Sequence, residues 1–110
     1  MNVELFEALL DSLKHPVLFV DTDHVIRFAN KAAIAQYKKE KTDLEGHSIF
    51  NCHNENSKRV ILEVFESFQV GEEERMIVDN ERHRLFMCAV RDKSGELIGY
   101  YERFKPPKAQ

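Results

Sequence analysis

The sequence predicts an α+β fold in which a five-stranded antiparallel sheet carries helices over one face and a flanking helix at the N-terminus. Apolar residues recur at helical spacing in two well separated segments. Strand-like segments occur near both ends of the chain, and the last three are joined by short turns, which suit antiparallel pairing. The 110 residues match the length of one domain.

Residues 1–14 are predicted to form an amphipathic helix that ends before Pro16, because the residue before a proline avoids the helical region. The helix is expected either to cover the core of its own domain or to form the seam of a homodimer, since intervals of three and four residues also typify coiled coils. Both interpretations remain open at this point. The apolar positions of the stripe are Val3, Phe6, Leu10 and Leu13.

Two short strands and a helix are predicted next. Residues 17–20 are apolar, and residues 25–29 form the return strand after a polar turn. Asn30 is suited to cap a helix over residues 31–37, because its side chain can accept a hydrogen bond from the first helical turn. Thr42 is expected to cap a further short helical turn.

A long amphipathic helix is predicted to begin after Asn56 or Ser57 and to stop at Gly71. Three strands should follow, over residues 74–78, 82–91 and 96–104. An enclosed space is expected between this helix and the sheet. The apolar face of the helix comprises Val60, Ile61, Val64, Phe65 and Phe68.

Four stretches and the order of the elements resemble the PAS family of sensory domains. The stretches are 16–21, 25–33, 44–47 and 90–100. The resemblance covers about residues 14–104 and implies a PAS domain over 15–104, with 1–14 as a flanking helix and 105–110 as a loose tail. Asn51-Cys52-His53 is also similar to a stretch in small bacterial PAS modules. The family implies a sensory or interaction module, often a homodimer, whose ligand lies between sheet and helices.

The candidate ligand pocket combines residues before and within the long helix with inward residues of the last two strands. Alternate residues of a strand share a face, which places members of both strands toward the helix. Each of these side chains could equally be part of the packed core. The candidates are Cys52, His53, Phe65, Met87 and Tyr100.

Haem is the one cofactor that the resemblance leaves open, because some PAS domains hold haem through a histidine near the long helix, where His53 lies. The Asn51-Cys52 pair invites comparison with flavin-binding light sensors, but their continuing motif and the glutamine of their last strand are missing, so flavin is not expected. Neighbouring Cys52 and His53 do not chelate one metal as spaced ligands do, so no metal site is predicted.

Composition excludes several classes of function. A net charge of −3 gives no electrostatic footprint for nucleic acid, and no apolar run reaches the length of a membrane helix. The N-terminus lacks the pattern of a secretory signal, which favours a cytoplasmic location. No catalytic motif is evident, so an enzyme is not expected.

The sequence therefore predicts a bacterial sensory module that binds a small ligand, a cofactor or a signalling partner protein and relays the signal through the packing of a homodimer. The alternative is a module with a filled core that binds no ligand and only dimerises or docks. A small α+β enzyme is a third class.

Overall fold

The computed structural model describes residues 2–107, apart from the side chain of Cys52. Met1 and residues 108–110, which include the end of the predicted tail, lie outside the described residues. No helix within the described range is long and apolar enough to cross a membrane.

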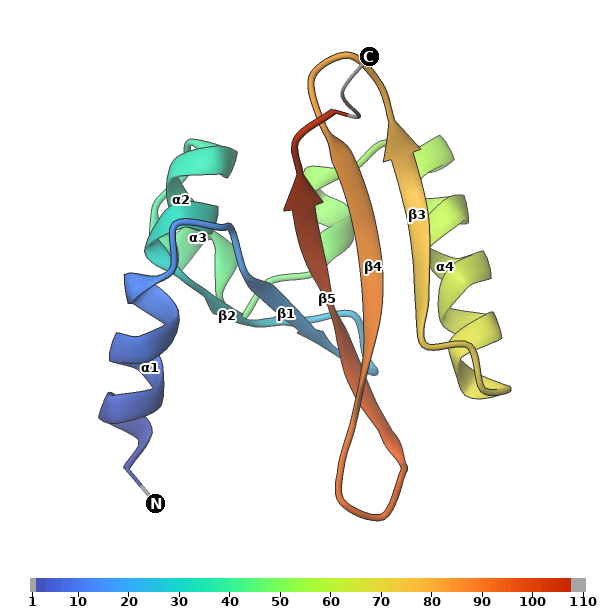
Figure 1. Ribbon diagram of the computed structural model, residues 1–110, viewed down its shortest axis with the longest axis horizontal. Helices are drawn as coiled ribbons and strands as arrows, with labels where there is room; N and C mark the ends of the chain where they lie inside the picture. Colours follow the sequence, from blue (N-terminus) through green and yellow to red (C-terminus); the bar gives the residue numbers. More distant parts are fainter. Residues whose placement is uncertain (1, 108–110) are drawn as a thin grey trace.

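Five antiparallel strands form one sheet in the order β2-β1-β5-β4-β3 (Figure 1). The α+β fold class is thereby confirmed. In chain order the elements are α1 (Val3–Ser12), β1 (Leu18–Asp21), β2 (Ile26–Ala29), α2 (Lys31–Tyr37), α3 (Lys41–Leu44), a 3₁₀ helix (Ile49–Cys52), α4 (Glu55–Gln69), β3 (Glu74–Asp79), β4 (Arg84–Arg91) and β5 (Leu97–Lys105).

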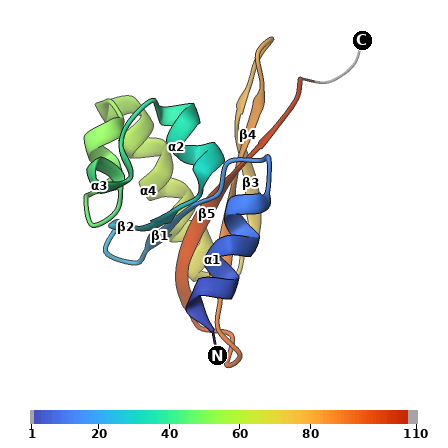
Figure 2. The ribbon, with the colours of Figure 1, turned by 90° about the vertical axis from the view of Figure 1, so that its left-hand side faces the viewer.

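The helices α2, α3 and α4 gather on one face of the sheet, which we call the inner face, and α1 lies apart from them (Figure 2). The core fills the space between this helical layer and the sheet. Its largest fully buried side chains include Tyr100 of β5, Phe68 of α4 and Met87 of β4. The end of α1 lies against the opposite face of the sheet, which we call the outer face.

The central strand β5 approaches β1 very closely at Gly99, which pairs with Asp21. A Cβ atom at this position would collide with the backbone oxygen of Val20 and lie 2.7 Å from the ring of Phe19. Only glycine therefore allows the two strands to pair here. This contact fixes the register that orients the inward residues of β5.

Asn30 is the N-cap of α2, as predicted, and its side chain makes four hydrogen bonds. Its Oδ1 accepts from the amides of Ala33 and Val17, both at 2.9 Å. Its Nδ2 donates to the carbonyl oxygens of Leu10 at 2.9 Å and His15 at 3.0 Å. The fully buried Asn30 thus ties the end of α1 to the start of α2.

The starts of two helices differ from the prediction. The N-cap of α4 is Asn54, whose Oδ1 accepts from the amide of Ser57 at 2.8 Å, rather than Asn56 or Ser57 itself. Asn54 precedes the other two candidates in the sequence, so the helix begins earlier than predicted, at Glu55. The N-cap of α3 is Glu40, which shares a reciprocal capping arrangement with Asp43, rather than Thr42.

Candidate functional site

An acidic side chain lies in the middle of the inner face of the sheet. Strand alternation in β5 turns Tyr100 and Glu102 toward the helices, and both are buried. Glu102 pairs with Leu18 of β1 on one side and with Met87 of β4 on the other. A carboxyl group therefore stands between two apolar neighbours in the centre of the sheet, where acidic residues are rare.

Only one oxygen of this carboxyl group has a hydrogen-bond partner among the described residues. The hydroxyl of Tyr37, in the last turn of α2, donates to Oε2 of Glu102 at 3.1 Å. Oε1 is buried and has no partner within residues 2–107. Burial raises the pKa of Glu102 above its ordinary value, and the nearby charge of His53 opposes that shift.

The half-buried His53 follows the 3₁₀ helix and precedes α4. Its Nδ1 lies 2.9 Å from the carbonyl oxygen of Ile49. Because a carbonyl oxygen can only accept, Nδ1 carries a hydrogen; Nε2 is then an acceptor in the neutral ring and a second donor in the protonated ring. His53 thus offers an acceptor near Glu102 in its neutral form and a positive charge in its protonated form.

A hollow of about 280 Å³ lies between α4 and the strands β3 and β4. We call it the α4 hollow. His53 stands in its wall, and the rest of the lining is apolar or uncharged polar. The lining residues are His53, Asn56, Ser57, Val60, Ile61, Ile77, Val78 and Leu85.

Glu102 lies near this hollow in the sheet but does not line it. Leu85 of the lining pairs with Phe104, and Met87, two residues further along β4, pairs with Glu102. Glu102 and Leu85 are therefore diagonal neighbours on the inner face, with Cα atoms roughly 7–8 Å apart, a separation that long side chains span. His53 both lines the hollow and acts electrostatically on Glu102.

An aromatic cluster fills the neighbouring part of the interior. Nδ1 of His24 lies 2.9 Å from the hydroxyl oxygen of Tyr100. The His24 ring also packs against Phe65, with centroids 4.8 Å apart, and against Phe50 at 5.1 Å. Burial lowers the pKa of His24, which favours its neutral form, and burial raises the pKa of Tyr100. This cluster is therefore an uncharged, packed region.

The predicted pocket residues fall into different places. His53 lines the α4 hollow, whereas Phe65, Met87 and Tyr100 are buried core residues that do not line it. The side chain of Cys52 lies outside the described part of the structure.

Sequence reasoning missed Glu102, Tyr37 and His24. One signal could have identified Glu102: it is the acidic member of the alternating series that contains Tyr100 and Phe104. No comparable pattern marks Tyr37 or His24, because the fold brings them to the interior from a helix end and a turn.

The outer face carries a second hollow, of about 550 Å³, between the end of α1 and the sheet. Leu10 and Leu13 line it from the helix side, while Val3 and Phe6 are exposed to 66% and 46%. The predicted seam residues are thus divided between a contact with their own domain and solvent. The sheet side of this hollow comprises Phe19, Phe28, Val90 and Tyr101.

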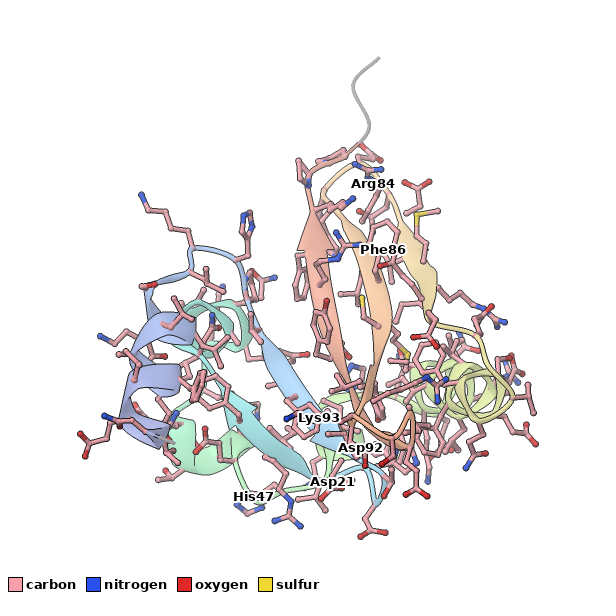
Figure 3. The ribbon with its side chains drawn as sticks, turned by 60° about the horizontal axis from the view of Figure 1, so that its bottom comes forward. Asp21, His47, Arg84, Phe86, Asp92 and Lys93 are labelled. Atoms are coloured by element: carbon pink, nitrogen blue, oxygen red, sulfur yellow. The ribbon has the colours of Figure 1, made fainter. Side chains whose placement is uncertain are left out.

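Further along the outer face, two basic side chains lie near one aromatic ring. Phe86 lies on β4 (Figure 3), and the guanidinium carbon of Arg103 lies 5.0 Å from the centroid of its ring. The ammonium of Lys105 lies 5.2 Å from the same centroid. Cations at this distance from a ring face are attracted to it.

The interior does not fit a haem group. The α4 hollow is smaller than the roughly 300–1,000 Å³ of pockets that hold drug-sized ligands, although Nε2 of His53 is chemically able to ligate iron. Within the described residues, no three histidine, cysteine or acidic side chains are grouped to hold a metal ion.

Comparison with known proteins assigns the chain to a family. The model of the PAS domain matches residues 14–103. No curated protein matches the sequence significantly.

Three solved structures illustrate the similarity of fold. A C-terminal domain from Streptococcus mutans is 21% identical, with a TM-score of 0.78 over 96% of this chain and 85% of that one. The PAS domain of BvgS from Bordetella pertussis is 18% identical, with a TM-score of 0.74 over 98% and 88%. A sensory box sensor histidine kinase from Vibrio cholerae is 16% identical, with a TM-score of 0.69 over 97% and 92%. These structures share the fold, and because the PAS domain model matches residues 14–103, the chain belongs to the PAS domain family.

Proposed function

We propose that this PAS domain is a sensory signal-transduction module, without catalysis of its own, that binds a small ligand in the α4 hollow. The observation that carries the proposal is the buried carboxyl of Glu102 beside that hollow, with Oε1 lacking a partner among the described residues. A buried polar atom without a partner destabilises a fold, so a binding role accounts for its presence. The similar folds of a sensor histidine kinase and of the BvgS PAS domain support a sensory role.

A continuous set of contacts connects the interior to α1. Tyr37 donates to Glu102 from the last turn of α2. The first turn of the same helix is capped by Asn30, whose Nδ2 donates to the carbonyl oxygen of Leu10 in α1. A ligand that engages Glu102 competes with or reorients Tyr37 and thereby acts on α2. In the proposed mechanism, α2 transmits that change to α1.

The output of this mechanism is a homodimer formed through α1. No residue of the helix is fully buried within its own chain, and Leu5 and Leu9 are 62% and 57% exposed. Exposed apolar side chains on one helix mark an interaction surface. A second copy of the chain is the proposed occupant, and a partner protein in a bacterial cytoplasm would read the state of the dimer.

Fragment binding observed by NMR tests the ligand site. Small fragments are expected to shift backbone amides around the α4 hollow, including those of Ile77 and Leu85. Val60→Trp, which fills the hollow, should abolish these shifts, whereas Leu62→Trp on the exposed side of α4 should leave them unchanged.

The alternative function, an interaction module without a ligand, is favoured by the packed interior around Phe65, Met87 and Tyr100. Absence of any fragment bound at the hollow, together with a stable dimer, would establish that alternative in place of the ligand sensor.

Light scattering tests the dimer. Leu9→Asp is expected to convert a dimer to a monomer, because it places a charge on the exposed apolar side of α1. Leu62→Asp on α4, where the side chain is 40% exposed, is the matched control and should leave the dimer intact. A dimer that survives Leu9→Asp would contradict the role of α1.

A further inference from the structure

We infer that the ligand of the α4 hollow is a small cation with N–H donors, an amine or an amidine, and that Glu102 and His53 accept its hydrogen bonds. This inference rests on the function proposed above, because it specifies the ligand of the same hollow.

The first argument is the hydrogen-bonding state of Glu102. Tyr37 supplies a donor to Oε2, while Oε1 is buried without a partner among residues 2–107. An ionised carboxylate accepts hydrogen bonds and donates none, so only a donor can satisfy Oε1. Glu102 is not among the residues that line the hollow, but its diagonal neighbour Leu85 is, so the proposed ligand reaches Oε1 by displacing that lining.

The second argument is that the protein provides acceptors here and that, apart from a protonated His53, no cation among the described residues acts on Glu102. The hydrogen bond from Nδ1 of His53 to Ile49 leaves Nε2 of the neutral ring able to accept from a ligand in the hollow. Each of the ion pairs found within residues 2–107 involves an acid other than Glu102. A buried carboxylate is stabilised by an opposite charge, and an amidine can supply that charge together with two N–H donors. An anionic ligand would instead be repelled.

The third argument is the size and character of the hollow. About 280 Å³ exceeds the roughly 150 Å³ cavity that holds a benzene molecule, so a single ring with a short polar group fits. Val60 and Ile61 on α4 and Ile77 on β3 provide apolar walls for the ring. The ligand class is therefore an apolar body with one cationic end.

Three probes of nearly equal size and shape but different charge test the inference: benzamidine, benzamide and benzoate. Each is titrated into the labelled protein, and the shifts of the amides around the hollow are followed by NMR. Benzamidine should bind at least about tenfold more tightly than benzamide, and benzoate should not bind, because hydrogen bonds to charged groups exceed those between neutral groups.

Two variants make the test specific. Glu102→Gln preserves the size of the side chain and should weaken benzamidine by roughly 10- to 100-fold. Glu66→Gln removes the same charge from an exposed position on α4 and should leave the affinity unchanged. Equal loss in both variants would show a general effect of net charge and would overturn the inference.

The outcomes separate the two levels of the argument. Benzamide or benzoate binding at the hollow as tightly as benzamidine would overturn the cation specificity and leave the ligand site standing. If none of the three probes shifts amides at the hollow, both this inference and its ligand site fail. Should Glu102→Gln not fold, the ranking of the three probes on the unmodified chain decides the question.

Discussion

Replacing Glu102 by glutamine should stabilise this protein at neutral and alkaline pH. The substitution keeps the volume of a side chain that is 1% exposed and keeps an acceptor for the hydroxyl of Tyr37. It removes the charge that burial disfavours. A buried acceptor without a partner costs about 1–3 kcal/mol, and more when it is charged, so we expect the free energy of unfolding to rise by about 1–3 kcal/mol.

The pH dependence follows from the direction of the pKa shift. Burial raises the pKa of Glu102 in the folded protein above its ordinary value of 4.5. Between that value and the folded-state pKa, the unfolded chain releases a proton that the folded chain retains, so stability falls as pH rises. The glutamine variant does not titrate. Its advantage should therefore be smallest below pH 4.5 and should grow until the pH exceeds the folded-state pKa.

Urea unfolding followed by far-UV circular dichroism measures this difference, since the chain has no tryptophan for fluorescence. Each kcal/mol corresponds to roughly 4–8 °C in the melting temperature of a domain near this size. Glu66→Gln is the control for a change in net charge at an exposed site. A glutamine variant that is less stable than the unmodified protein at high pH, or an advantage that does not vary with pH, would refute the reasoning.

Three further substitutions test the scaffold. Asn30→Ala removes the N-cap of α2 and the link to α1, so urea unfolding should show a loss of about 2–4 kcal/mol in the free energy of unfolding. Asn30→Asp should recover part of this loss because it keeps the acceptor. Equal losses in the two variants would contradict this. Met87→Ala leaves a cavity in the core and should cost about 2–5 kcal/mol in thermal unfolding, whereas a negligible change would show that the site is loosely packed. Gly99→Ala forces a methyl group against the backbone of Val20, and hydrogen exchange should show unprotected β1 amides; a native pattern of protection would rule out the close approach.

The elements that could be predicted from the sequence are those with local signals. Asn30 followed by a run of good helix formers identifies both its cap and its helix, and Gly71, with a φ of 116°, stops the long helix. The start of α4 was misplaced because Asn54, Asn56 and Ser57 all suit an N-cap, and only the completed structure selects among them. The local sequence alone therefore does not distinguish among these three positions.

The candidate site was harder to predict because its members are distant in sequence. Tyr37 and Glu102 are 65 residues apart and meet only after β5 has inserted between β1 and β4. A glutamate in a strand usually faces solvent, so its inward direction depends on a register that cross-strand pairing sets. His53 could be selected because its position before the long helix matches a family pattern, which requires no knowledge of pairing.

The position of β5 in the middle of the sheet has a mechanical consequence. Glu102 faces the interior, while its covalent neighbours Tyr101 and Arg103 face the opposite side, where Tyr101 borders the hollow beside α1. Consecutive residues of β5 therefore face the interior and the hollow beside α1. A sideways movement of the strand would therefore shift residues on both faces of the sheet together. Because β5 contributes residues to both faces, a change in packing on the inner face is expected to affect packing on the outer face.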